Sequence, residues 1–392
     1  MTDRVYLDWN ATAPLRPQAR AAMAMAMDLV GNPSSVHGEG RAARRLIEDA
    51  REKVAAAVGA QPRNVIFTSG GSEANALALS RNLELDGKGS CDTAIVSNIE
   101  HASVLHGGDL QGLSGSQFCA GRDGVASLSH LKERIREGLR DGKHTPLVAL
   151  MAANNETGVI QPVSEAADIA HSSGGLMHVD AVQALGKMPL DIKLLGTDLL
   201  AISAHKVGGP MGVGALILAS DRLHFRNGSR FGGGQERNRR GGTENVVGIA
   251  GFGAAAVEAC GGDIEGEGQR LARLRQRLEH GLRETWPTTI IFGEEAPRVP
   301  NTVQFAVDGL KAQTALIALD LEGVAVSSGS ACSSGKVSFS TVVSAMGYDA
   351  RIAEGAIRIS FGWTTTEAEI DSFLKAWRKV SQPLLKRREI AA

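Results

Sequence analysis

The sequence predicts an α/β fold, with a large domain built on a mostly parallel sheet and a smaller C-terminal α+β domain. Short apolar segments rich in Val and Ile recur along the chain, and helical stretches such as 41–60 separate them. The predicted strands are 64–69, 93–97, 146–152, 175–180, 198–204 and 213–218. Strands that are apolar along their whole length, with helices between them, are typical of a parallel sheet covered on both faces.

The character of the sequence changes after about residue 262. There the Gly- and acid-rich segment 260–268 precedes a strongly helical stretch, which indicates a boundary. We therefore assign 15–262 to the large domain, and 1–14 together with 263–392 to the small domain.

The small domain is predicted to hold two strands, two helices and one long loop. The strands are 301–307 and 356–361, and the helices are 313–323 and a terminal helix from Glu367. The loop spans about 328–340 and carries Cys332 between small, flexible residues. Such residues predict a mobile, exposed loop.

Composition and charge exclude several classes of protein. A chain of 392 residues, 43% of them hydrophobic, is long enough to bury one large core or two adjoining cores. The 42 basic and 43 acidic residues leave a net charge of -1, so neither nucleic acid nor an anionic membrane is an expected partner. The sequence has no apolar run of signal-peptide or membrane-spanning length, and we expect a cytoplasmic protein.

The cysteines do not form a recognisable framework. Cys91, Cys119, Cys260 and Cys332 are widely spaced and include no C-x-x-C pair, so neither disulfides nor a zinc site are indicated. We expect thiols, and three of them are expected to be small buried hydrophobic residues. Cys332 differs because of its loop.

Polar residues follow the predicted strands directly. In parallel sheets ligands bind beyond the carboxyl ends of the strands, so these residues are the candidates for a site. They are 69–72, 98–101, 154–157, 180–183 and 203–206.

Two of these segments suggest a chemistry. Gly71 and Ser72 lie between a strand and a helix predicted to begin near Glu73, where backbone N–H groups bind phosphate; the alternative is an ordinary capped turn. Lys206 follows a strand in SAHKVGGP, where glycines allow close approach and the amine can form a Schiff base. The alternative for Lys206 is a solvated surface lysine.

Ordered motifs along nearly the whole chain resemble those of one enzyme family. They are YLDWNATAP, GNPSSVHGEGR, TSGGSEAN, EHASV, NNETGVIQP, HVDAVQALGK, SAHKVGGPMGVGAL, GGGQERNRRGGTENV and SSGSACSSG. The sequence is similar to the cysteine desulfurases of the NifS/IscS type, which are class V members of the fold-type I pyridoxal-phosphate enzymes. The resemblance implies a seven-stranded, mostly parallel sheet in the large domain, and pyridoxal 5'-phosphate as cofactor.

The resemblance implies a role for each matching residue. Lys206 matches the lysine that binds the cofactor, Asp180 the carboxylate at the pyridine nitrogen, and His101 the imidazole over the ring, which also moves protons. Asn155 and Gln183 match residues near the phenolic oxygen of the ring. The matches to the phosphate cradle are Gly71, Ser72, Ser203 and His205.

Further matches concern the substrate and a second subunit. Arg358 matches the arginine that binds the carboxylate of L-cysteine, together with Asn155; the alternative for Arg358 is a surface-strand arginine. Thr243 matches a phosphate ligand contributed by the other subunit, which implies a homodimer. Cys332 matches the nucleophile that receives sulfur as a persulfide, and the resemblance extends to a transient contact of this thiol with an iron–sulfur cluster. A loop cysteine of no consequence is the alternative.

The implied activity is conversion of L-cysteine to L-alanine, with the sulfur passed to an acceptor or cluster-scaffold protein. The alternatives are a selenocysteine lyase or another class V aminotransferase, and a non-enzymatic sulfur carrier. Neither the acceptor nor the pathway follows from the sequence. Three departures from the family pattern stand out: Ser72 in place of Thr, the stretch KVSFSTVVSAMG after Cys332, and Trp363 where a basic residue is common.

Overall fold

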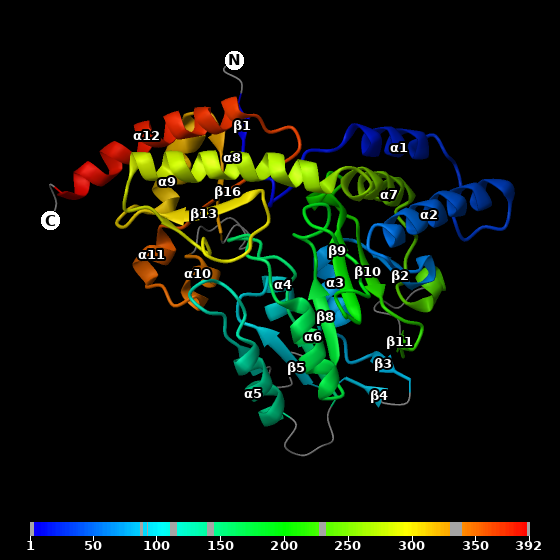
Figure 1. The fold of residues 1–392 in the computed structure, drawn as a ribbon. Helices are drawn as coiled ribbons and strands as arrows, with labels where there is room; N and C mark the ends of the chain where they lie inside the picture. Colours follow the sequence, from blue (N-terminus) through cyan, green and yellow to red (C-terminus); the bar gives the residue numbers. More distant parts are fainter. Residues whose placement is uncertain are drawn as a thin grey trace.

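Seven strands form the central sheet of the chain, in the order β2-β10-β9-β8-β7-β5-β6. Their bounds are β2 (Val65–Thr68), β5 (Thr93–Ser97), β6 (Ser116–Phe118), β7 (Pro146–Ala149), β8 (Leu176–Asp180), β9 (Leu199–Ser203) and β10 (Gly214–Leu218). The computed structural model describes residues 4–86, 89–91, 93–109, 116–138, 145–226, 233–329 and 339–389. Figure 1 shows this sheet beside a second, C-terminal body.

Both faces of the central sheet are buried, as the apolar strands predict. On one face the core includes Val65 and Phe67, and on the other it includes Ile66, because neighbouring side chains of a strand point to opposite faces. The first face packs against α2 (Gly38–Ala56), α5 (Leu128–Gly138), α6 (Val163–Ser172) and α7 (Val246–Cys260). The second face packs against α3 (Gly71–Ala78) and α4 (Ala102–Leu105), while α1 (Pro17–Met27) lies on α7.

One strand of the sheet, β10, runs antiparallel to both of its neighbours. Only residues 204–213 separate it from β9, and they contain one short 3₁₀ helix, Ala204–Lys206, in place of a crossover helix. A parallel neighbour would need a longer crossover connection. The sheet is therefore mostly parallel, as predicted, with one reversed strand.

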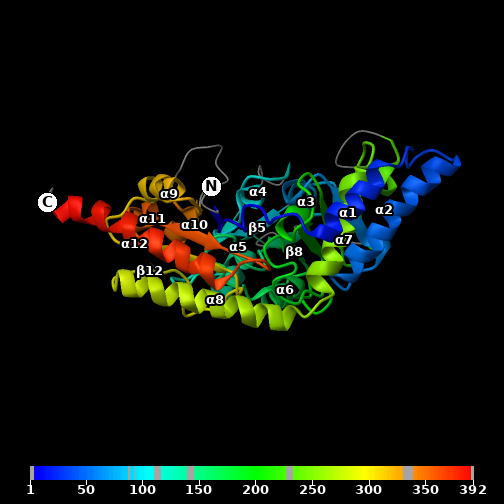
Figure 2. The ribbon, with the colours of Figure 1, turned by 90° about the horizontal axis from the view of Figure 1, so that it is seen from above.

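The C-terminal body is an antiparallel four-stranded sheet covered by long helices. Its strands follow the order β12 (Ile290–Ile291), β13 (Thr302–Ala306), β16 (Ile357–Ser360) and β15 (Ser327–Ser328). Its helices are α8 (Ile264–Thr285), α9 (Ala312–Leu321), α10 (Thr341–Ala345), α11 (Ala350–Glu354) and α12 (Glu367–Glu389). Figure 2 shows α8 and α12 running side by side along this body.

The N-terminus belongs to the core of the C-terminal body. Strand β1 (Val5–Tyr6) pairs in parallel with β14 (Val324–Ala325), and Leu7 and Trp9 pack with side chains of α8 and α12. The remaining strands, β3 (Leu83–Leu85), β4 (Gly89–Ser90) and β11 (Leu223–Phe225), form a small antiparallel sheet. Among the described residues, Pro62–Asn64 is a further short 3₁₀ helix, and Gln235–Asn238 forms a 3₁₀-like turn with non-helical backbone angles at Glu236 and Arg237.

The boundary segment predicted at 260–268 is shorter than expected. Helix α7 ends at Cys260 and α8 already begins at Ile264, so two glycines of the predicted break lie inside a helix. Asp263 explains this start, because its side chain accepts a hydrogen bond from Gly266 N at 2.8 Å and caps the helix.

The predicted α/β fold class is confirmed, whereas the domain limits at 14 and 262 stay predictions. Within the described ranges, no single helix combines the length and apolar character needed to cross a bilayer. Helices α7 and α8 meet that criterion only when taken together, and they are bent by 78° at the break between them.

A buried ion pair joins α2 to a segment with unusual backbone geometry. Glu236, Arg237 and Asn238 all have positive φ angles, of 46°, 57° and 63°. This region costs free energy for residues with a Cβ atom. The carboxylate of Glu236 accepts from both Nη atoms of Arg51, at 2.8 and 2.9 Å, and from the backbone N of Phe67 at 3.0 Å. We infer that this pair stabilises the strained turn.

We expect Arg51→Met to lower the free energy of unfolding by about 3–5 kcal/mol, because it leaves the buried carboxylate of Glu236 unpaired. The double variant Arg51→Met/Glu236→Leu should be less destabilised than Arg51→Met alone. Glu48→Ala, which removes a half-exposed partner of Arg51, is the control and should cost less than about 1 kcal/mol. Urea denaturation measures all three; a double variant no better than Arg51→Met would contradict the explanation.

Candidate functional site

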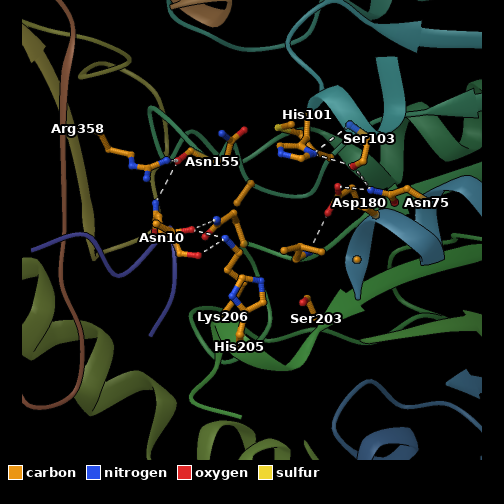
Figure 3. A pocket seen from close by; sticks show the side chains of 17 residues that line it. Asn10, Asn75, His101, Ser103, Asn155, Asp180, Ser203, His205, Lys206 and Arg358 are labelled. Carbon is orange, nitrogen blue, oxygen red and sulfur yellow. Dashed lines mark hydrogen bonds between the residues drawn. The ribbon is translucent and has the colours of Figure 1, made fainter. Parts of the chain in front are cut away.

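A cavity of about 320 Å³ opens at the carboxyl ends of the central strands. It is lined from both bodies. Asn10 and Ala11 come from the N-terminal segment and Arg358 from β16, while the other lining residues lie at the ends of the central strands or in the loops and helices that follow them. Figure 3 shows these side chains converging on the cavity.

Most of the residues predicted from the sequence line this cavity. They are Gly71, Ser72, His101, Asn155, Asp180, Gln183, Ser203, His205, Lys206 and Arg358. Thr243 is exposed and lines a separate hollow with Ser69 and Arg240. Cys332 lies outside the described residues.

The Lys206 amine is directed at the N-terminal segment. Its Nζ atom donates to the carbonyl oxygens of Asn10 at 2.6 Å and Ala11 at 2.8 Å. Lys206 closes the short helix Ala204–Lys206 directly after β9, so the rigid central sheet fixes its backbone. The amine is thereby held at the cavity by groups that can release it to another partner.

A second lysine, Lys187, lies half-buried beside the first, and sequence reasoning missed it. Its Nζ atom donates to Asn10 Oδ1 at 2.9 Å and to Gln183 Oε1 at 2.5 Å. Burial, with smaller contributions from Lys206 and Arg358, lowers the pKa of Lys187 well below its ordinary value. The sequence feature that could have found Lys187 is its position in the motif HVDAVQALGK, four residues after Gln183.

Asp180 is held by two nitrogen donors at the end of β8. Its Oδ1 atom accepts from Val182 N at 2.9 Å, and its Oδ2 atom accepts from Asn75 Nδ2 at 2.8 Å. The side-chain oxygen of Asn75 contacts His178 Nε2 at 2.9 Å. Burial lowers the pKa of His178 to about 4, so the ring is neutral at neutral pH.

His101 faces the cavity next to this network. Its Nδ1 atom lies 2.7 Å from Ser103 Oγ and accepts from Ser103 N at 3.1 Å, which also caps helix α4. The preceding residue, Glu100, is buried; burial and then the charge of Asp180 raise the pKa of its carboxyl well above the ordinary value. Neither Asn75 nor Ser103 was predicted as a site residue.

The opposite end of the cavity suits an anion. Helix α3 starts there without a side-chain cap at Gly70, which leaves its first N–H groups for a ligand. In the described part of the chain, the buried Oγ atom of Ser203 has no hydrogen-bond partner. A Cβ atom on Gly71 would lie only 2.7 Å from the Val182 side chain, so this position has no room for a residue larger than glycine unless Val182 moves. Burial and then the charge of Lys206 lower the pKa of His205 to about 4.

Arg358 is not a surface arginine, because its side chain is only 4% exposed. Its Nη2 atom pairs with Asp8 Oδ1 at 2.8 Å, and its Nη1 atom donates to Asn155 O at 3.0 Å. Among the described groups, neither the Nε atom of Arg358 nor the Oδ1 atom of Asn155 has a hydrogen-bond partner. Both atoms therefore retain capacity for a ligand.

Glu156, the neighbour of Asn155, contacts both described ends of the segment that carries Cys332. Its Oε2 atom accepts from Ser340 Oγ and, at 2.8 Å, from Gln304 Nε2. A Cβ atom on Gly329 would collide with the same oxygen. The two residues that flank the segment of Cys332, Gly329 and Ser340, therefore lie close to the cavity-lining Asn155 through its neighbour Glu156.

Trp363, the unexplained departure from the family pattern, has a clear packing role. The Arg16 guanidinium lies 3.8 Å from the centre of its ring, and Trp9 packs edge-on at 4.6 Å. A Cβ atom on Gly208 would lie 2.5 Å from the indole. Trp363 therefore supports the backbone just after Lys206.

Comparisons with known proteins cover nearly the whole chain. The model of the Aminotransferase class-V family matches residues 5–373. A cysteine desulfurase IscS of Dictyoglomus turgidum is 38% identical over 98% of this chain and 96% of its own length. A cysteine desulfurase of Cereibacter sphaeroides is 41% identical over 95% of this chain and 94% of its own length. The X-ray structure of a NifS-like protein from Rickettsia africae superposes with a TM-score of 0.86 at 34% identity, over 96% of this chain and 99% of that one.

We expect the free energy of unfolding of the cofactor-free protein to fall as the pH drops from 6.5 toward 4. In this window the unfolded chain protonates His178, whereas the folded chain keeps the ring neutral. The contribution is at most about 1.4 kcal/mol per pH unit for one histidine, and His205 adds to it in the same direction.

Urea midpoints between pH 7 and pH 5, compared for the wild type and His178→Gln, measure this effect. The variant should show the weaker pH dependence, and His280→Gln, which replaces an exposed histidine of α8, should behave as the wild type. Equal pH dependence in the wild type and His178→Gln would contradict the assignment.

Proposed function

Because the chain belongs to the Aminotransferase class-V family, and within it to the NifS/IscS-type cysteine desulfurases, we propose that it converts L-cysteine to L-alanine at the described cavity. The observation that supports this most is the placement of Lys206, Asp180, His101 and Arg358 around one cavity. The finer assignments below are part of the same proposal.

The residues of the cavity fit pyridoxal 5'-phosphate. The uncapped start of α3 and the Ser203 hydroxyl without a described partner suit its phosphate, and the Asp180 carboxylate suits its pyridine nitrogen. Asn155 and Gln183 would bind near its phenolic oxygen, and Lys206 would hold it covalently. When bound, the cofactor supplies an electron sink for negative charge at the substrate Cα atom.

The chain's own groups then divide the remaining tasks. Arg358, aligned by Asp8, binds the substrate carboxylate, since a guanidinium presents several N–H donors in a fixed plane. The Lys206 amine and the His101 imidazole are the groups placed to move protons. Lys187 orients Gln183 and Asn10 by donating to both of their side-chain oxygens.

We assign capture of the sulfur to Cys332. Its thiolate would attack the sulfur of bound L-cysteine, forming an S–S bond as the Cβ–S bond breaks, and the persulfide would then pass sulfur to an acceptor. Support comes from Gly329 and Ser340, which flank this segment and contact Glu156, the chain neighbour of the cavity-lining Asn155. The proposal also includes an iron–sulfur scaffold as the acceptor and a transient contact of Cys332 with the cluster. It further includes a cytoplasmic location.

A homodimer completes the proposal. Thr243 is exposed and lies outside the cavity of its own chain, which suits a residue that serves the phosphate of a second copy. Large apolar side chains are also exposed near α1 and the loop after Lys206, namely Met25, Met27, Val30 and Met211.

We expect Cys332→Ala to keep the visible absorbance of the bound cofactor and to lose sulfide release from L-cysteine. The reason is that the variant retains the cavity but lacks the nucleophile. Cys119→Ala, which removes an exposed thiol outside the cavity, is the matched control and should keep full activity. Full sulfide release by Cys332→Ala would rule out the role of Cys332. Production of alanine from selenocysteine but not from L-cysteine would favour the lyase alternative.

Mixing inactive subunits tests the dimer. Lys206→Ala removes the cofactor lysine, and Thr243→Asp places a negative charge against the phosphate, so each variant alone should be inactive. If Thr243 acts across the interface, a mixed dimer contains one intact site, and unfolding and refolding equal amounts together should recover about a quarter of wild-type activity. No recovery in mixtures shown to contain the mixed dimer would contradict the assignment.

A further inference from the structure

The cavity contains a continuous chain of hydrogen bonds that joins Asp180 to His101. It runs from Asp180 Oδ2 to Asn75 Nδ2 at 2.8 Å, from Asn75 Nδ2 to Ser103 Oγ at 2.9 Å, and from Ser103 Oγ to His101 Nδ1 at 2.7 Å. Figure 3 shows the dashed lines along this path. Each link has a direction, and the directions can be worked out one after another.

The orientation of the Asn75 amide follows from Asp180. A carboxylate only accepts hydrogen bonds, so the Asn75 group facing Asp180 must be its NH₂ group. The reversed amide would place two acceptor oxygens 2.8 Å apart. The Asn75 oxygen therefore faces His178 Nε2 at 2.9 Å, and this nitrogen must carry a proton.

The neutral state of His178 agrees with that orientation. Its ring is fully buried, and burial lowers its pKa to about 4. A neutral imidazole carries one ring proton, and Asn75 fixes that proton on Nε2. His178 thus holds the amide from the side opposite Asp180.

The orientation of Ser103 follows from Asn75. The second N–H of the amide donates to Ser103 Oγ, so the serine hydroxyl hydrogen is left for another acceptor. His101 Nδ1 is that acceptor at 2.7 Å, and the backbone N–H of Ser103 points at the same nitrogen from 3.1 Å. Two donors directed at Nδ1 leave no place for a proton there.

We propose that Asn75 and Ser103 are positioning residues that hold His101 as the neutral tautomer with its proton on Nε2. The inference rests on the proposed function only in taking this cavity as the active site. With Nδ1 engaged by Ser103 and Nε2 protonated, His101 donates a proton or a hydrogen bond into the cavity. Uptake of the substrate Cα proton then belongs to the Lys206 amine.

The tautomer can be measured directly by ¹⁵N NMR on the holoenzyme labelled at histidine, with His101→Gln used to assign the signals. We expect an unprotonated nitrogen at Nδ1 and a protonated nitrogen at Nε2. The two are distinguished by their couplings to the carbon-bound ring protons. A proton on Nδ1 in the wild type would overturn the proposal.

Two variants at Ser103 test whether its hydroxyl group sets the tautomer of His101. Ser103→Ala removes the hydroxyl donor, so the populations of the two tautomers of His101 should become more nearly equal. The difference in ¹⁵N chemical shift between Nδ1 and Nε2 should then shrink. Ser103→Thr keeps the hydroxyl and should retain the wild-type difference. Asn75→Ala should reduce the difference as Ser103→Ala does. An unchanged ¹⁵N chemical-shift difference in either alanine variant would refute the proposal that Asn75 and Ser103 set the tautomer.

Sulfide release measured on the same samples separates this inference from the proposed function. A wild type that releases sulfide but carries the His101 proton on Nδ1 would overturn the tautomer inference alone. A wild type with the expected tautomer but without sulfide release would overturn the proposed function alone.

Discussion

Asn10 is the residue on which the geometry of the cavity depends. It is 1% exposed, and each of its polar groups is used. Its backbone N and side-chain NH₂ bind the C-terminal body through Ser360 and Thr302, each at 2.9 Å. Its backbone oxygen accepts from Lys206 and Gln183, and its side-chain oxygen accepts from Lys187. Because a buried polar atom without a partner is costly, this arrangement fixes the position of the two bodies at the site.

The charges around the cavity are separated by sign. Lys187, Lys206 and Arg358 lie on the side of Asn10, where Asp8 pairs with Arg358. The carboxyl groups of Asp180 and Glu100 lie on the side of the central sheet, where burial and then the charge of Asp180 raise the pKa of Glu100. Electrostatics therefore favours a carboxylate on the first side of the cavity and a protonated nitrogen on the second.

The rigid part of the site comes from the central sheet. Asp180 ends β8 and Lys206 lies just after β9; both strands are buried on both faces, which keeps these backbones fixed. Ser340, at one described end of the Cys332 segment, donates to Glu156, and Gly329, at the other end, lies against the same carboxylate.

The sequence by itself determined the α/β class and the strands beside the cavity, and most of the residues that it singled out line that cavity. It could do so because apolar strands and the polar residues after them are local patterns, and because the motifs extend over nearly the whole chain. It did not determine the reversed direction of β10, the helical start of α8 at Ile264, or the packing of Trp363. Asn10, Asn75, Ser103 and Lys187 also escaped prediction, since each of them depends on at least one partner far away in the sequence; Asp180, for example, follows Asn75 by 105 positions. Only the tertiary structure decides such contacts, because hydrogen bonds between buried groups depend on how the elements pack and not on the residues next to them in the chain.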